Sequence, residues 1–306
     1  MSGNRERLEN REQGTGNGGR HDEWVPGARP ATATSGVAEN PLFEYLLRLA
    51  DDRLVLGHRL SEWCGHAAIL EEDIALANIA LDLIGQASML LKLAGEVEGK
   101  GRNEDALAYF RDAIEFRNAQ LVELPNGDFA VTIVRQFLFD AWDVLVLERL
   151  TGASNPTLAG IAAKALKEAK YHLRHTAEWV RMLGDGTAES HARAQRALDD
   201  LWPYTTELFL SDDIDAHAVT SGSGVDVESL RPRWRQTVEQ VLGEATLTVP
   251  KDGFAPRGGR TGRHRLVAPH VRRVSFLPPW RGEPLPGASL HRVGRRRRLR
   301  GIRRRA

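Results

Sequence analysis

The 306-residue sequence contains one cysteine, Cys64, which excludes a disulfide framework and any metal site built from several cysteines. It also lacks a run of 18 apolar residues, so we expect no membrane-spanning helix. The first 20 residues include no apolar segment of the kind found in secretory signals. The P-loop motif Gly-x-x-x-x-Gly-Lys-Ser/Thr and the Gly-x-Ser-x-Gly nucleophile motif are absent too. The sequence therefore predicts a cytoplasmic protein without support for nucleotide binding.

Positive and negative charges are distributed unevenly along the chain. From Arg257 to the end there are 16 Arg, no Lys and one acidic residue, Glu283, whereas residues 1–256 contain 26 Lys and Arg against 40 Asp and Glu. Such asymmetry indicates a segment with a separate origin or a separate partner. Nucleic acid is one candidate partner, but the terminal Arg runs lack interleaved aromatic residues and the acidic body would repel it. We expect no specific nucleic-acid binding.

The chain divides into three parts by composition. Residues 1–38 contain few apolar positions and are expected to be disordered, because they cannot bury enough surface to offset the entropy of ordering. Residues 39–250 show helical periodicity and are predicted to form one helical domain. Residues 251–306 mix Gly, Pro and Arg without a helical or strand period, so we expect them to be disordered or read in an altered frame.

Long segments of helical periodicity, separated by short loops, predict an all-α fold. The expected architecture is a ferritin-like helical bundle with four long core helices. Pro41, Asn155-Pro156 and Gly184 supply the boundary signals for two of them. The expected helices cover about 41–63, 70–95, 104–122, 128–151, 156–183, 189–210 and 227–241. A short segment at 245–249 is the one place where a strand is considered.

Two core helices carry further expectations. The helix over 70–95 is apolar nearly all round, so it is expected to be central to the bundle. Its few polar residues lie four apart on one stripe, at Asn78, Asp82 and Gln86. In the helix over 41–63, charged residues on the face opposite the leucine stripe are expected to form i,i+4 ion pairs. These pairs are Glu44–Arg48 and Arg48–Asp52, and the stripe consists of Leu42, Leu46, Leu49, Leu56 and Leu60.

Carboxylates and a histidine on the core helices are the candidate metal ligands. Ferritin-like di-iron proteins place a Glu on each of two helices and Glu-x-x-His on each of the other two, because residues three apart reach the same metal. No Glu-x-x-His occurs here: the position three after Glu168 is Tyr171. We favour a buried hydrogen-bonded seam with a cation from Arg135, Lys164 or Arg174. The residues from which a metal site could still be built are Asp140, Asp143, Glu168 and His172.

A second polar cluster follows the end of the first helix. His58, Glu62 and His66 are spaced four apart, and Cys64 lies between the last two. A metal site is one hypothesis for this cluster, and an ion-pair cluster at the end of the helix is the favoured one. Cys64 has no motif that supports a nucleophilic role, and free cysteines are mostly small apolar residues of the core.

Five ordered motifs, spread over about residues 40–262, carry a family resemblance. They are LVLGHRLSEWCGH (54–66), DIALANIALDLIGQA (73–87), PNGDFA (125–130), AKALKEAKYHLRH (163–175) and EATL (244–247). In these motifs the chain resembles the PaaC family, the C-type subunits of the bacterial phenylacetyl-CoA epoxidase, which is also called 1,2-phenylacetyl-CoA monooxygenase. The length and order of the motifs make the resemblance specific.

The resemblance implies a ferritin-like fold and a structural, non-catalytic subunit. A homologous catalytic partner, PaaA, would carry the di-iron centre and bind the CoA thioester. A reductase subunit with FAD and an iron–sulfur cluster would deliver electrons from NADPH, and the complex would use O2 to epoxidise the aromatic ring in phenylacetate degradation. This chain would then have no catalytic, cofactor-binding or metal-binding residues. Its degenerate ligand positions would be Asp140, Asp143, Glu168 and His172.

The resemblance ends near Gly262, where family members continue with a His-Thr-Glu-His-Leu motif and a closing helix. We hypothesise a shift of the reading frame near codon 262, which the other two frames of the DNA would test. A protein that positions another is expected to expose an apolar helix face, although the sequence does not say which. Self-association, residual metal binding and an active di-metal oxidase with atypical ligands are the alternatives left open.

Overall fold

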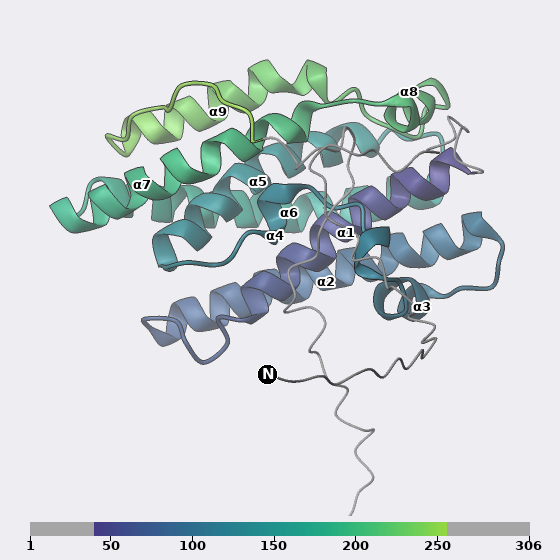
Figure 1. Cartoon of the computed structure of the whole chain (residues 1–306), viewed down its shortest axis with the longest axis horizontal. Helices are drawn as coiled ribbons and strands as arrows, with labels where there is room; N and C mark the ends of the chain where they lie inside the picture. The colour runs from purple at the N-terminus through teal and green to yellow at the C-terminus, as the bar shows by residue number, and fades with distance from the viewer. Residues whose placement is uncertain (1–39, 256–306) are drawn as a thin grey trace, which may run out of the picture. The chain divides into compact units, whose positions relative to one another are not determined.

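The computed structural model describes residues 40–255 of the chain (Figure 1). The expectations for residues 1–38 and 256–306, including disorder and the altered reading frame, lie outside the described residues. Between residues 40 and 255 every regular element is helical, which confirms the predicted all-α class. The α-helices are α1 (Pro41–Ser61), α2 (Leu70–Glu98), α3 (Glu104–Tyr109), α4 (Gln120–Glu123), α5 (Phe129–Leu150), α6 (Pro156–Gly184), α7 (Ala188–Thr205), α8 (Asp213–Thr220) and α9 (Arg231–Glu244). Single 3-10 turns lie at Ala113–Glu115, Thr206–Phe209 and Glu228–Leu230.

The four predicted core helices are α1, α2, α5 and α6. In the bundle α1 packs along α2, α5 packs along α6, and α2 lies against α6, while α7 and α9 cover the α5–α6 pair (Figure 1). Local capping explains why three of these helices begin where the sequence predicts. The side chains of Asn40, Asp128 and Asn155 each accept a hydrogen bond from the backbone N–H three residues later, at 3.0–3.1 Å.

Helix α1 is more buried than its many charged residues would suggest. Almost every residue from Phe43 to Leu60 is buried, and the buried set includes the charged residues Arg48, Asp51 and Arg53. By contrast, α2 exposes part of its apolar surface, so the expectation that α2 is the central helix is wrong. Being apolar all round is compatible with burial but does not enforce it, because burial depends on which neighbours the topology supplies.

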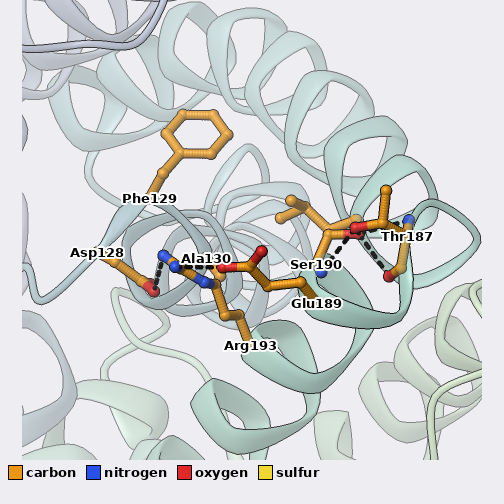
Figure 2. A pocket seen from close by; sticks show the side chains of 8 residues that line it. Asp128, Phe129, Ala130, Thr187, Glu189, Ser190 and Arg193 are labelled. Atoms are coloured by element: carbon orange, nitrogen blue, oxygen red, sulfur yellow. Dashed lines mark hydrogen bonds and ion pairs between the residues drawn. The ribbon is translucent and has the colours of Figure 1, made fainter.

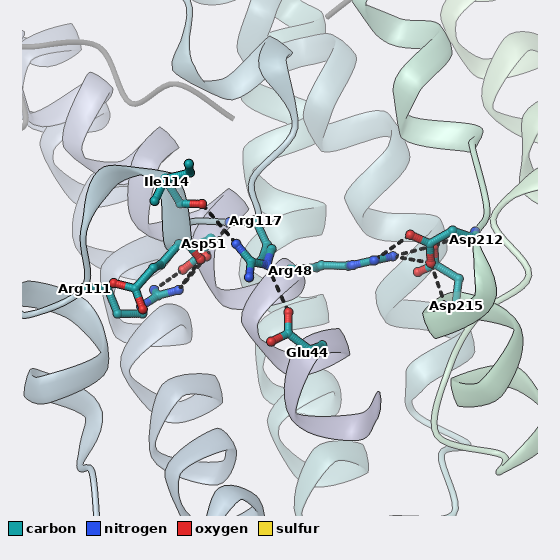
Figure 3. Close-up of polar contacts among 9 residues, drawn as sticks. Glu44, Arg48, Asp51, Arg111, Ile114, Arg117, Asp212 and Asp215 are labelled. Carbon is teal, nitrogen blue, oxygen red and sulfur yellow. Dashed lines mark hydrogen bonds and ion pairs between the residues drawn. The ribbon is translucent and has the colours of Figure 1, made fainter. Parts of the chain in front are cut away.

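The expected i,i+4 ion pairs along α1 are not formed. Arg48 instead reaches α8, where Nη2 lies 2.6 Å from Asp212 Oδ2 and Nη1 lies 2.7 Å from Asp215 Oδ2 (Figure 3). Glu44 pairs with Arg117 at 2.9 Å (Figure 3). The reason is burial: i,i+4 pairs describe exposed helix faces, whereas a helix enclosed on all sides directs its charges to the elements packed around it.

The segment 104–122 was predicted as one helix, and that prediction is wrong. It is broken into α3, a 3-10 turn and α4 because it wraps around a buried carboxylate of α1. Arg111 Nη1 lies 2.9 Å from Asp51 Oδ2, and the backbone N–H of Arg117 donates to the same oxygen at 2.8 Å (Figure 3). In a continuous helix that N–H would bond to the carbonyl four residues earlier.

The chain after α7 departs from the sequence expectations in two places. The short helix α8 was not predicted, although Asp212 caps it by accepting from the N–H of Ile214 at 3.0 Å. Residues 245–249 were considered as a strand, which is wrong: Ala245 caps α9, and Thr246 has a left-handed backbone with φ of 57°. A residue in that region reverses the chain direction and does not continue an extended strand.

Among the described residues, α2 is the one helix long and apolar enough by composition to cross a membrane. Its most apolar window has a mean hydropathy of 1.7, and 44% of that window is buried within the bundle. Core helices of water-soluble proteins meet the same criterion, so length and composition alone do not place this helix in a membrane.

Candidate functional site

A chain of polar side chains crosses the interior between the four core helices. Arg53 of α1 donates from Nη2 to Asp143 of α5, and from Nε to Gln86 Oε1 of α2 at 3.1 Å. Gln86 then donates to Glu168 Oε2 of α6 at 2.9 Å. The chain therefore links all four core helices through two of the candidate ligand positions, Asp143 and Glu168.

The third candidate, His172, lies beside this polar chain on α6. Its side chain is buried, and Nε2 lies 3.0 Å from Asp82 Oδ2 of α2, whose side chain is 41% exposed. Burial raises the pKa of Asp143, while the charges of Arg53 and His172 act in the opposite direction. Arg53 is thus the buried counter-ion of Asp143, and Asp82 brings the polar interior to the surface at the α2–α6 seam.

No cation within residues 40–255 is paired with the fourth candidate, Asp140. Its Oδ1 accepts from Gln136 Nε2 at 2.7 Å, and its Oδ2 is 3.0 Å from the hydroxyl of Thr176. Burial raises the pKa of Asp140 well above its usual value, the two hydrogen bonds lower it only in part, and the charge of Asp143 raises it further. The surroundings of Asp140 therefore favour the protonated form of its carboxyl group, which hydrogen-bonds within the core.

These residues do not fit a di-iron centre. Such a centre needs carboxylates and imidazoles that converge on the metals, but here a permanent cation, the Arg53 guanidinium, binds Asp143 in the middle of the bundle. Gln86, a neutral amide, takes up one Glu168 oxygen, and Asp140 is directed to Thr176. In the described part of the chain no group of three His, Cys, Asp or Glu side chains is placed to hold a metal ion. The absence of catalytic, cofactor-binding and metal-binding residues stays a prediction.

Sequence reasoning missed Arg53, although a signal was present. The leucine stripe of α1 includes Leu49 and Leu56, and Arg53 lies between them at the position where the 3,4-spaced pattern requires another inward-facing residue. A charged residue in the apolar stripe of a core helix must have a buried partner. That gap in the stripe was the available clue to the polar interior.

Of the three cations expected beside the seam, Lys164 reaches the seam residue Glu168, whereas the prediction is wrong for Arg135 and Arg174. Arg135 hydrogen-bonds to the carbonyl of Leu124. Lys164 is exposed, with Nζ 3.9 Å from Glu168 Oε1, and Arg174 lies 5.3 Å above the ring of Tyr171. All three lie on α5 or α6, whereas the cation that neutralises the seam comes from α1.

The cluster after the first helix is an ion-pair cluster rather than a histidine site. Glu62 accepts from Arg59 Nη1 at 2.9 Å, and the His66 ring nitrogen Nδ1 contacts the backbone carbonyl of Cys64 at 3.1 Å. Burial lowers the pKa of His58, and the charge of Glu62 opposes that shift. The favoured hypothesis of an ion-pair cluster holds, with Arg59 as the cation, and the Cys64 thiol is exposed.

Two of the family motifs meet in space at this end of the bundle. Arg59, from the motif at 54–66, and Arg135 hydrogen-bond around the turn formed by the motif at 125–130. Arg135 donates to Asn126 Oδ1 at 2.5 Å, and Asn126 Nδ2 donates to the carbonyl of Arg59 at 2.7 Å. Burial, together with the charge of Arg59, lowers the pKa of Arg135 to about 9. These motif residues therefore hold the turn that starts α5.

An open pocket of about 300 Å³ lies between the starts of α5 and α7 (Figure 2). Arg193 spans it, 2.6 Å from Glu189 and 3.5 Å from Asp128. The hydroxyl of Thr187 accepts from the N–H of Ser190 at 3.1 Å and caps α7. The polar groups that line the pocket are thus engaged in ion pairs and helix capping, which gives the pocket a structural role. The lining residues are Asp128, Phe129, Ala130, Leu183, Thr187, Glu189, Ser190 and Arg193.

Comparison with known proteins gives the same family as the sequence motifs. A family model described as phenylacetic acid catabolic protein matches residues 20–299. The chain is 49% identical over 239 residues to the C-type subunit of 1,2-phenylacetyl-CoA epoxidase from Escherichia coli (strain K12), an alignment that covers 78% of this chain and 96% of the relative. The family match extends past the motif-bearing residues 40–262 at both ends, and the altered reading frame stays a prediction. This ferritin-like helical bundle belongs to the family of phenylacetic acid catabolic proteins.

Proposed function

We propose that this chain is a non-catalytic, structural subunit of a multicomponent epoxidase that acts on phenylacetyl-CoA in phenylacetate degradation. In this role it binds and positions a homologous catalytic partner of the PaaA type. The likeness to the C-type subunit of an epoxidase of that name supports the proposal at the level of the complex. The buried Arg53–Asp143 ion pair supports it at the level of this chain.

Arg53 is the observation that carries the non-catalytic role. A guanidinium is effectively always protonated in proteins, so this interior charge cannot be removed by loss of a proton. A divalent metal about 4 Å from it would be repelled by on the order of 8 kcal/mol at an effective dielectric constant of about 20. Metal binding at Asp143 would therefore require Arg53 to leave a pocket in which its side chain is 1% exposed.

The chemistry would then belong to the partners. The catalytic partner would hold the di-iron centre, and a reductase subunit with FAD and an iron–sulfur cluster would deliver electrons from NADPH. This chain would supply a rigid bundle whose interior is neutralised by its own side chains. A cytoplasmic location follows from that assignment, because the substrate is a CoA thioester.

Co-expression with the catalytic partner from the same operon tests the proposal. We expect a stable stoichiometric complex on size-exclusion chromatography in moderately high salt, which suppresses adhesion through the Arg-rich segment. Iron analysis of the complex and of this chain alone should find stoichiometric iron in the complex only.

Two outcomes would contradict the proposal. Stoichiometric iron in this chain alone, lost in Glu168→Ala, would indicate the di-metal oxidase with atypical ligands. Failure to bind the catalytic partner, both with the present C-terminus and with an in-frame C-terminus, would remove the structural role itself.

A further inference from the structure

An apolar stripe on α2 faces solvent. Leu70, Ile74 and Leu81 are 69%, 53% and 66% exposed, and they lie on one side of the helix at spacings of four and seven residues. Gly85 and Ser88 continue the same side toward the C-terminal half and are exposed as well. Exposed large aliphatic side chains that line up over several turns are unusual on the surface of a monomer.

The neighbouring face of α6 is basic, in contrast to the rest of the bundle. Residues 40–255 contain 34 Asp and Glu against 21 Lys and Arg. Four of these cations, however, fall within eleven residues on the exposed side of α6. In the described part of the chain, Lys167 and Arg174 form no ion pair, and Arg174 lies over the 52% exposed ring of Tyr171. The basic row consists of Lys164, Lys167, Lys170 and Arg174.

The apolar stripe and the basic row belong to one continuous surface. The seam between α2 and α6 is closed by the Asp82–His172 contact and the Gln86–Glu168 hydrogen bond. Both contacts hold the two helices side by side without covering their outer faces. From Leu70 to Ser88 the stripe is about 27 Å long at 1.5 Å per residue. With a width of about 20 Å for two helices, the outline of this face covers about 540 Å², roughly two thirds of the 800 Å² that each partner buries in a standard interface.

We propose that the outer faces of α2 and α6 form the docking surface for the catalytic partner, an inference that rests on the role proposed above. The complementary partner surface presents apolar side chains against Leu70, Ile74 and Leu81. It presents carboxylates against Lys167 and Arg174. The apolar stripe supplies the affinity, and the basic row sets the orientation and the rate of association.

A lipid surface is the competing occupant, because apolar stripes flanked by cations also bind membranes. The carboxylates of the same face argue against it. Glu71 is exposed beside the stripe, and the Asp82 side chain is 41% exposed at the seam. Anionic lipid would repel both, and neither would find a hydrogen-bond donor in hydrocarbon, whereas a protein partner can provide donors.

The sharpest test uses Gly85, where an added Cβ would meet no atom within 4 Å. Gly85→Tyr therefore leaves the fold intact but places a ring on the docking surface. We expect its affinity for the catalytic partner, measured by biolayer interferometry with the full chain, to fall at least about 30-fold. The matched control is Gly243→Tyr on α9, which is also exposed with open space around it, and it should bind as the original chain does.

A charge-reversal pair tests the basic row. Lys167→Glu with Arg174→Glu should weaken binding about tenfold, mainly through slower association at low salt. The control pair is Arg149→Glu with Arg196→Glu, which changes the net charge equally at exposed sites on α5 and α7. Circular dichroism and thermal unfolding confirm that each variant is folded.

Three results would overturn the docking surface. If Gly85→Tyr binds as tightly as its control, the partner lies on another face, and the structural role stands without this inference. If the original chain sediments with vesicles of phosphatidylcholine and phosphatidylserine and the Lys167→Glu/Arg174→Glu variant does not, the occupant is a membrane. If Gly85→Tyr instead dissociates a homodimer while the complex persists, the occupant is a second copy. Complete failure of the original chain to bind the catalytic partner would remove the inference together with the proposed function.

Discussion

The helices α1 and α2 pack along each other, yet the more polar helix, α1, is the more buried of the two. α1 contains five charged residues that are buried, whereas the more apolar α2 leaves large aliphatic side chains in solvent. Each charge of α1 is tolerated because another element supplies its partner, as Asp143 does for Arg53. Hydrophobicity therefore reports what a helix face can contact, while the topology decides what it does contact.

Removing the Arg53 guanidinium should cause the largest loss of stability. In Arg53→Met the buried Asp143 carboxylate loses its counter-ion, so we expect the free energy of unfolding to fall by about 3–5 kcal/mol. Urea denaturation followed by circular dichroism measures the change. The double variant Arg53→Met/Asp143→Leu should recover most of the loss, and the exposed Arg149→Met on α5 should show almost none. A loss that the double variant fails to recover would mean that the pair is not the source.

Removing Arg48 should have a smaller effect with a distinct pH dependence. Arg48→Met should cost about 2 kcal/mol, less than Arg53→Met, because Asp212 is 39% exposed and can be rehydrated. The buried Asp215 carboxylate loses the same cation but keeps the hydrogen bond from the backbone N–H of Asp212 at 3.2 Å. Burial alone would raise the pKa of Asp212, but the hydrogen bond and charge of Arg48 override it and lower the pKa to about 2.

The sign of this pH dependence follows from the lowered pKa. The stabilisation is present above the ordinary pKa of 3.8 and is lost as the pH falls through 2. Denaturation between pH 5 and pH 2 should show a steeper acid loss for the original chain than for Arg48→Met. Equal slopes would contradict the coupling, and hydrogen exchange should locate the destabilisation in α8.

Replacing the Asp140 carboxyl group by an amide should stabilise the fold, the opposite of the two preceding substitutions. A carboxyl group whose folded pKa is raised retains its proton in the fold but loses it in the unfolded chain, so its presence destabilises the fold as the pH rises above 3.8. In Asp140→Asn the amide can keep the contacts to Gln136 and Thr176 without this penalty. We expect higher stability than the original chain at pH 7 and no difference below pH 3.8. Lower stability at pH 7 would mean that Asp140 is ionised and paired.

The smallest effect on the free chain should come from the exposed stripe of α2. Leu81→Ala should change the free energy of unfolding by less than about 0.5 kcal/mol, because the side chain is 66% exposed. Leu76→Ala on the same helix, where the side chain is fully buried, should cost about 2–5 kcal/mol. Similar losses for both, measured by urea denaturation, would mean that the stripe is covered in the free chain.

The sequence predicts those parts of the fold that depend on interactions between residues close together in the chain. The starts of α1 and α6 follow from Asn40-Pro41 and Asn155-Pro156, where the amide side chain caps the helix and proline suits its first turn. The four core helices follow from their apolar periodicity. The short helix α8 also has a local signal, the capping box of Asp212 and Asp215, which the sequence-based prediction missed. Its attachment to α1 could not be predicted in this way, because Arg48 tethers its start from 164 residues away.

In the candidate site, too, contacts between residues far apart in the sequence could not be predicted. Helical spacing identified four candidate residues, at positions 140, 143, 168 and 172. Three of them, Asp143, Glu168 and His172, do lie along the polar chain between the core helices. Their counter-ion could not be assigned, because Arg53 and Asp143 are 90 residues apart and meet only once α1 and α5 are packed in one bundle. The i,i+4 pairing expected for Arg48 failed because that rule presumes an exposed helix face.

Arg53 also changes what the bundle requires from the cell. A cation that is part of the polypeptide is made during translation, and no chelator can extract it. We therefore expect this chain to fold equally well under iron starvation and iron sufficiency. Its supply would then follow gene expression alone, and under the proposed function a folded subunit would be ready before the catalytic partner acquires its metal.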